Sequence, residues 1–242
     1  MFGITAIERQ FENALDDFGS EAEIPRLYLS IYETVNDRAV EDDVVHQMLN
    51  QHAGFWCLTV NALFESSLVS LHRLFDSDSK RNAARLLTLA EEHIDIFTRP
   101  QLARRIQNEH NIEDASDWVR AAYEPSLDDF RRLREEVESR WKIYKDIYRP
   151  IRCRVIAHRV LTDAESLQLF SRTNRTQLQE VCVFFVALHA ALSRLYRRGE
   201  PIQIRASAKT RPAHGQPNRR RAERPQGKAV MIAAIYARKS TD

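Results

Sequence analysis

The chain has 242 residues, of which 43% are hydrophobic and 29% charged, and this suits one medium-sized domain or a domain with a tail. Such a composition excludes disorder throughout the chain. With only 6 glycines and 8 prolines, a turn-rich β-sandwich and a glycine-looped nucleotide-binding fold are both disfavoured. We therefore expect a mostly helical protein.

The charge is unevenly distributed along the chain. Residues 203–242 contain ten Lys or Arg and two Asp or Glu, a net charge of +8, which leaves −6 for residues 1–202 because the whole chain carries +2. Within that acidic body, residues 131–159 hold ten basic and four acidic residues, a local +6. This segment is the part of the body best suited to bind phosphates.

Cysteine usage and hydropathy bear on the compartment. Cys57, Cys153 and Cys182 are odd in number and never spaced as C-x-x-C, which disfavours a disulfide framework or a zinc ribbon. No basic-then-apolar signal opens the chain, and the longest apolar run, residues 181–193, is shorter than the roughly 20 residues of a membrane-spanning helix. We expect a soluble cytoplasmic protein that does not contact a membrane.

Apolar residues recur at intervals of three and four along most of the first 200 residues, which predicts a series of amphipathic helices. The first two are separated at Ile24-Pro25, because proline is tolerated in the first turn of a helix. The longest pattern predicts the central core helix. The predicted helices span residues 5–18, 24–38, 42–76, 81–97, 126–149 and 174–198, with two short ones within 101–124.

Local signals mark several helix ends. Ser126-x-x-Asp129 resembles a capping box at the start of the helix over residues 126–149, and Pro150 kinks or ends that helix. Gly199 stops the last helix. The amphipathic helices must cover one another's apolar stripes. We expect an all-α bundle of four to six helices, built from residues 42–76, 81–97, 126–149 and 174–198.

The C-terminal part differs in character. Residues 205–228 hold prolines, glycines and an Arg219-Arg220-Arg221 run without apolar periodicity, which is typical of disorder. Residues 229–236 are typical of a buried strand, yet the body supplies no strand to pair with it. The expected organisation is a helical domain over residues 1–202, a disordered basic linker over 203–228 and a truncated strand over 229–242.

An arginine and a histidine five intervening residues apart occur twice, as Arg152 with His158 and as Arg104 with His110, and Arg105 fits a looser form of the same pattern. The neighbours of His110 are polar and loop-like. Residues 152–158 instead lie between two predicted core helices, where side-chain geometry would be fixed. The second occurrence is therefore the better candidate site.

Three features together resemble the HEPN superfamily, and specifically its AbiU-like abortive-infection branch. They are the all-helical pattern, the Leu71-His-Arg73-Leu-Phe-Asp76 end of the long helix, and Arg-x4-Ala-His-Arg before the last helix, which contains the Arg-x5-His pattern. The resemblance covers roughly residues 5–198. It implies phage defence or a toxin–antitoxin system, with metal-independent RNA cleavage in a cleft between two copies; other members are inactive or act as partners of nucleotidyltransferase antitoxins.

The candidate residues suit that chemistry. Cleavage of RNA by its own 2′-hydroxyl needs a group that exchanges protons near neutral pH, a role for His158. It also needs positive charge where the phosphorane gathers negative charge, a role for Arg152. On an α-helix Arg154 shares the face of His158, whereas Arg152 lies roughly 120° away, so Arg154 is a further candidate.

Other positions also bear on this hypothesis. The family often has a polar residue directly after the motif arginine, and this chain has Cys153. Arg73 and Asp76 are either supporting site residues or a helix-end ion pair. His46 and His52 do not share a helical face, and we find no metal-ligand spacing and no phosphate loop, so we expect neither metal nor other cofactor.

The last twelve residues resemble a second family, because Met231-Ile-Ala-Ala-Ile-Tyr236-Ala-Arg238-Lys-Ser240 is similar to the opening strand of a serine recombinase catalytic domain. A recombinase needs a complete α/β sheet, so Ser240 is not expected to be catalytic here. A truncated fusion, an overlapping gene and coincidence remain alternatives. Three functions therefore stay open: an endoribonuclease, a non-catalytic module that binds RNA or an antitoxin, and a fragment of a recombinase fusion acting on DNA.

Overall fold

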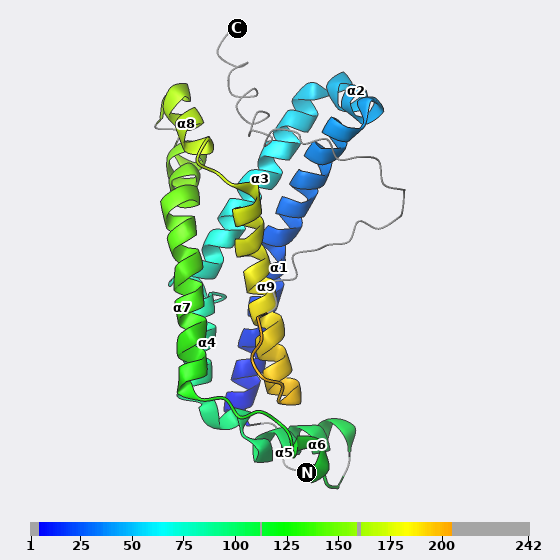
Figure 1. Cartoon of the computed structure of the whole chain (residues 1–242), viewed down its shortest axis with the longest axis vertical. Helices are drawn as coiled ribbons and strands as arrows, with labels where there is room; N and C mark the ends of the chain where they lie inside the picture. The colour runs from blue at the N-terminus through cyan, green and yellow to red at the C-terminus, as the bar shows by residue number, and fades with distance from the viewer. Residues whose placement is uncertain (1–4, 112, 159–160, 205–242) are drawn as a thin grey trace, which may run out of the picture.

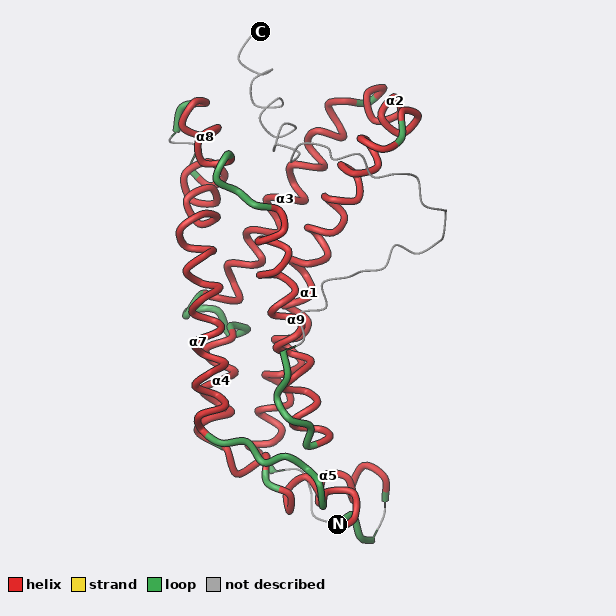
Figure 2. Tube along the Cα trace, in the orientation of Figure 1, coloured by secondary structure: helices red, strands yellow, loops and turns green. Residues whose placement is uncertain are grey.

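The computed structural model describes residues 5–111, 113–158 and 161–204. Over these residues the chain forms nine α-helices, one 3-10 helix and two π-helical segments, with no strand among them (Figure 2). The predicted all-α class is confirmed, and the helix count exceeds six because short helices lie at both ends of the bundle. The elements are α1 (Ala6–Glu41), α2 (Asp43–Gln51), α3 (Ala53–Phe75), α4 (Ala83–Glu92), η1 (Ile94–Phe97), α5 (Arg99–His110), α6 (Ser116–Val119), α7 (Leu127–Ile143), η2 (Tyr144–Tyr148), η3 (Ile151–Ala157), α8 (Asp163–Phe170) and α9 (Arg175–Arg198).

The first helix is continuous, so the predicted break at Ile24-Pro25 is wrong. α1 runs over 36 residues with Pro25 inside it. Phe18 before the proline and Leu29 after it are both buried in the same core cluster. Proline removes one backbone hydrogen bond, but burial on both sides of it holds the helix in one line along α3 and α9.

The predicted helix over residues 42–76 is divided into two. Its backbone leaves the helical region at His52, which separates α2 from α3. Asp42 caps α2 by accepting a hydrogen bond from the Val44 amide at 2.9 Å. None of the α2 side chains is buried, so no core contact keeps α2 in line with α3, and α2 forms the corner from which α3 returns along α1 (Figure 1).

The core is a helical bundle in which α1 packs against α3, α9 and α4, and α4 packs against α7. Figure 1 shows α7 and α4 side by side and α1 beside α9. The predicted bundle therefore forms, with α1 as an additional long member. Its interior is rich in aromatic rings, including the T-shaped pair of Phe75 and Phe185 at 4.9 Å.

The helix that begins at α7 continues past Pro150, so this proline does not end it. The predicted capping box is confirmed, since the Asp129 carboxylate accepts hydrogen bonds from the Ser126 amide and hydroxyl, both at 2.8 Å. Beyond α7 the chain winds as π-helix in η2 and η3 on either side of Pro150. The wider i to i+5 hydrogen bonding accommodates a residue that has no N–H to donate.

The last helix matches its prediction. α9 is capped by the Asn174 side chain, which accepts from the Gln177 amide at 3.1 Å, and it ends at Gly199 with a φ of 62°. A side chain at Gly199 would also meet the Ala122 Cβ at 2.6 Å, so this position requires glycine. Beyond it, Ile204 packs partly buried against the core. The predicted linker from residue 205 and the strand over 229–242 lie outside the described residues.

Two helices, α3 and α9, are long and apolar enough to cross a membrane by length and composition alone. Half of the most apolar stretch of α9 and one third of that of α3 are buried inside the bundle. Core helices of soluble proteins share these properties. The membrane prediction rested only on the longest unbroken apolar run, which is shorter than the apolar stretch found in either helix.

Candidate functional site

The predicted Arg-x5-His segment lies at the end of the π-helical winding that precedes α8. Arg152 and Arg154 lie within η3, and His158 is its C-terminal cap residue with φ −117° and ψ −13°. Ile151 and Val155 are buried and hold this turn on the core. Single π-turns within helices are rare and are frequent at functional sites, so the unusual winding coincides with the predicted motif.

Arg152 is half-buried and faces the end of α3. Its Nε is buried and has no hydrogen-bond partner, and its Nη1 lies 3.5 Å from the Cys153 Sγ, a weak acceptor. Within residues 5–111, 113–158 and 161–204, no carboxylate lies within ion-pair distance of it. An arginine in this state retains most of its capacity to bind an anion.

Arg154 and His158 are exposed, on the side near α8. Hydrogen bonds from Thr162, with a smaller contribution from the positive charge of Arg154, lower the pKa of the Glu165 carboxyl in the first turn of α8. Among the described residues no hydrogen bond joins His158 to Arg152 or Arg154. The predicted angles between His158 and the two arginines assumed the rotation per residue of an α-helix. They do not apply, because this segment is π-helical.

The two predicted supporting residues do not pair with each other. Arg73 forms an ion pair of 2.7 Å with Glu21 of α1, whose side chain is buried. Asp76 follows α3 as its cap residue and accepts a hydrogen bond from the Asp78 amide at 3.2 Å. Arg73 thus joins α1 to α3, while Asp76 shapes the turn beside the site.

Sequence reasoning did not single out His72, which lies close enough to Arg152 for the charge of the arginine to act on it. Its ring stacks on Tyr144 at 5.8 Å between centroids, and its Nδ1 is buried without a partner. Burial first, and then the positive charge of Arg152, lower the pKa of His72, against an opposing contribution from Asp76. The spacing from Leu68 to His72 and on to Phe75 places this histidine on the inner face of α3, a signal that the sequence does contain.

The other Arg–His segment has a different environment. Arg104 and Arg105 of α5 both form ion pairs with the buried Glu8, and Arg105 also donates to the Tyr196 carbonyl at 2.9 Å. His110 ends the helix and its ring lies 5.6 Å from that of Trp118. These arginines are already bound within the protein, which supports the choice of the second segment.

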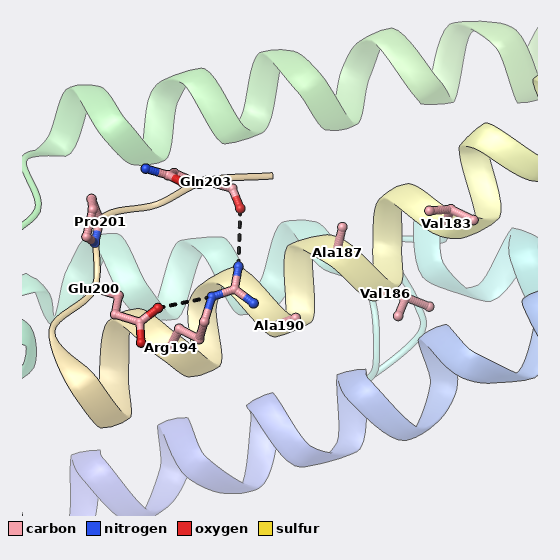
Figure 3. Close-up of a pocket in the computed structure, with 8 residues that line it drawn as sticks. All are labelled: Val183, Val186, Ala187, Ala190, Arg194, Glu200, Pro201 and Gln203. Carbon is pink, nitrogen blue, oxygen red and sulfur yellow. Dashed lines mark hydrogen bonds and ion pairs between the residues drawn. The ribbon is translucent and has the colours of Figure 1, made fainter. Parts of the chain in front are cut away.

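A cavity of about 540 Å³ lies along α9 and the segment that follows it (Figure 3). Arg194 crosses it, with an ion pair to Glu200 at 3.4 Å and a hydrogen bond to the Gln203 carbonyl at 3.3 Å. None of the motif residues lines this cavity. No group of three His, Cys, Asp or Glu side chains in the described part of the chain could hold a metal ion.

The residues that resemble a recombinase strand, Tyr236, Arg238 and Ser240, lie outside the described residues.

Comparison with known families places this arrangement in context. A HEPN-group family model described as AbiU2 matches residues 5–222, which includes the complete helical bundle and the Arg-x5-His segment. The match also extends beyond the last helix into the basic segment that the sequence predicts to be a linker. Searches of curated proteins and of solved structures return no match.

Proposed function

Since the chain belongs to the AbiU2 family of HEPN-type abortive-infection proteins, we propose that it is a defence endoribonuclease that cleaves RNA without a metal ion. The proposal extends to a cytoplasmic protein acting in phage defence or as the toxin of a toxin–antitoxin pair. In this proposal Arg152 binds the scissile phosphate, with Arg154 assisting, and His158 exchanges protons.

The observation that carries the proposal is a group of arginines without counter-ions at one helix end. Arg149, Arg152 and Arg154 have no ion pair in the part of the chain that the structure describes. Elsewhere, Arg134 and Arg175 reach across to carboxylates on other helices. A half-buried cation that the protein leaves uncompensated favours an anionic ligand, and a phosphodiester is the anion that this family resemblance suggests.

The proposed chemistry uses these groups directly. The planar guanidinium of Arg152 can donate two parallel hydrogen bonds to the non-bridging phosphate oxygens, where negative charge gathers as the 2′-oxygen attacks. His158 is exposed at the end of η3, where it is accessible to a long polymer such as RNA. Proton transfer by such a histidine typically contributes about 10²–10⁴-fold to a rate.

A homodimer is part of the proposal, because no hydrogen bond joins Arg152 to His158 within the described part of one chain. Apolar side chains of the α2–α3 corner support such an association. Val44, Met48, Phe55 and Leu58 are each at least 60% exposed, and exposed apolar patches of this kind are typical of protein interfaces. The same surface would also suit the second candidate function, a non-catalytic module that binds an antitoxin protein.

Cleavage of total cellular RNA by the full-length chain in the presence of EDTA tests the proposal. We expect 2′,3′-cyclic phosphate ends, a loss of about 10²–10³-fold in Arg152→Ala and a loss of at least about 10²-fold in His158→Ala. His110→Ala is the matched control, since His110 follows Arg104 at the same spacing, and it should keep wild-type activity. A folded dimer that cuts none of several RNAs would refute the nuclease and favour the binding module.

A further inference from the structure

His72 occupies an unusual position for a core histidine, at the junction of α3 with the π-helical segment. Its ring lies between aromatic neighbours, with centroid distances of 5.8 Å to Tyr144 and 6.4 Å to Trp141. Tyr144 is itself fixed, because its hydroxyl donates to the Leu68 carbonyl at 3.0 Å. The imidazole therefore stacks on Tyr144 and lies at a tilt of 32° to the Trp141 ring.

Neither ring nitrogen of His72 is hydrogen-bonded within the described part of the chain. Nδ1 is buried without a partner. Nε2 is not among the buried atoms that lack a partner, so it is the nitrogen that a ligand can reach. Buried polar atoms in folded proteins are normally hydrogen-bonded, and an exception calls for a functional explanation.

The opposite side of the same junction holds a second exception. Nε of Arg152 is also buried without a hydrogen-bond partner. Arg152 lies close enough for its charge to act on His72, and Arg149 adds a smaller contribution of the same sign. Two unpartnered polar atoms from separate helices therefore lie at the same junction, between α3 and the π-helical segment that carries the proposed phosphate-binding arginine.

The charged and titratable groups around His72 determine its protonation. Arg152 and Arg149 face it from the π-helical segment, Asp76 faces it from the end of its own helix, and the Tyr144 hydroxyl is engaged with Leu68. Burial and the two arginines outweigh Asp76, so the pKa of His72 lies below its ordinary value of 6.5. At neutral pH the imidazole is uncharged and can accept a proton.

We infer that His72 is a second acid/base histidine of this site, which takes the proton of the attacking RNA 2′-hydroxyl while Arg152 holds the phosphate. The inference rests on the proposed ribonuclease function and extends it to a residue outside the Arg-x5-His motif. It also assigns different roles to two histidines. His72, which is half-buried at the junction, is the base, and His158, which is exposed at the end of η3, is the acid.

The step is balanced without any further reactant. The 2′-oxygen forms a bond to phosphorus as its proton passes to Nε2 of His72, and the bond from phosphorus to the 5′-oxygen breaks. A protonated His158 gives its proton to the departing 5′-oxygen. The products are a 2′,3′-cyclic phosphate and a free 5′-hydroxyl, and water returns both histidines to their starting states by proton exchange.

The chain offers a matched control for a purely structural role. His189 of α9 is also half-buried, its ring packs against Gly19 of α1, and burial lowers its pKa as well. It lies in the α1–α9 interface, away from Arg152. His189→Gln should therefore perturb the fold about as much as His72→Gln while leaving RNA cleavage at the wild-type rate.

The test uses the full-length chain, an RNA containing one mapped cleavage site, and the same RNA with sulfur replacing the 5′-bridging oxygen at that site. A thiolate leaves without being protonated, so the sulfur substrate should restore cleavage by His158→Ala. It should not restore His72→Gln or His72→Phe, which lack the base. His72→Phe keeps the aromatic stack and so preserves the fold. We expect each His72 variant to lose at least about 10²-fold on either substrate.

The wild-type pH dependence gives a second readout that a structural role would not affect. The rate should rise with pH through a value below 6.5, because only neutral His72 accepts the proton, and this limb should be absent in His72→Phe. A folded His72→Phe protein that cleaves at the wild-type rate, or one that the sulfur substrate restores, would overturn the inference alone. A wild-type chain that cuts no RNA would overturn the proposed function and this inference together.

Discussion

An arginine and a histidine with five residues between them occur twice in this chain, in α5 and at the end of η3. In α5, Arg104 and Arg105 are neutralised by the buried Glu8. In η3, Arg152 has no carboxylate at ion-pair distance in the described residues, and its Nε has no partner. The same short pattern thus serves as a structural link in one place and as a candidate anion site in the other. What distinguishes them is whether a distant part of the chain supplies the counter-charge.

The largest effect is expected from removing the counter-charge of Arg104 and Arg105 in α5. Glu8→Gln leaves Arg104 and Arg105 partly buried without their shared carboxylate, and removal of one partner of a buried ion pair is strongly destabilising. We expect the free energy of unfolding to fall by about 3 kcal/mol, measured by urea denaturation. RNA cleavage per folded molecule should not change. A loss below about 0.5 kcal/mol would show that Glu8 does not hold α5 to the bundle.

In η3, substitution of Arg152 should lower activity and leave stability unchanged. Arg152→Lys keeps the charge but loses the planar fork that binds two phosphate oxygens, so cleavage should fall by about 10²-fold. The free energy of unfolding should stay within about 0.5 kcal/mol of wild type, because no internal ion pair is broken.

Arg105→Lys is the matched control for that substitution. Arg105 donates to Glu8, to the Ile96 carbonyl at 2.7 Å and to the Tyr196 carbonyl at 2.9 Å, a set that a lysine cannot reproduce. This variant should lose about 2 kcal/mol of stability and keep its activity. If both arginine variants changed the same property, the contrast between the two segments would be incorrect.

A smaller effect is expected from pH. Burial raises the pKa of Glu8, but hydrogen bonds from Thr5, Arg105 and Arg104 outweigh it, so the folded-state pKa lies below the ordinary 4.5. A lowered carboxyl pKa stabilises the fold at pH values above 4.5, and this contribution is lost as pH falls through the folded-state pKa.

The difference in the free energy of unfolding between wild type and Glu8→Gln should therefore be smaller at pH 3 than at pH 7. A difference that grew on acidification would mean that burial dominates and that Glu8 is protonated in the fold.

The smallest effect concerns the residue after the motif arginine. Cys153 is half-buried, and its Sγ is the acceptor nearest to Arg152, at 3.5 Å. Cys153→Ser replaces a weak acceptor by a hydroxyl of similar size, so we expect cleavage to change by no more than about threefold and stability by less than about 1 kcal/mol. Initial rates on one RNA would show this. A change of tenfold or more would make this position part of the catalytic arrangement.

Much of the fold could be predicted because its signals are local. The apolar stripe and caps of α9, the Ser126 capping box and the glycine stop at Gly199 each depend on residues within one or two turns. The continuity of α1 through Pro25 could not be read in this way, since it depends on packing against α3 and α9. The same holds for the π-helical winding around Pro150, where burial of Tyr148 and Ile151 on either side keeps the chain helical.

The candidate site shows the same division. The sequence indicated Arg152, Arg154 and His158 as a segment, and their positions at the end of one helix follow from chain connectivity. The sequence also contained the spacing of Leu68, His72 and Phe75 that places His72 on the inner face of α3. That the charge of Arg152 acts on His72 depends on how α3 packs against the π-helical segment, and no local pattern specifies that packing.

By itself, the sequence determined that the chain is helical, where α7 begins, where α9 begins and ends, and which segment of the body carries a net positive charge. Only the tertiary structure decided which arginines are free to use that charge. Helix caps and stripes depend on neighbours three or four residues apart, whereas Glu8 and Arg104 are separated by 96 positions. Because electrostatic compensation depends on distance in space, a motif of seven residues cannot reveal whether its arginine is already paired.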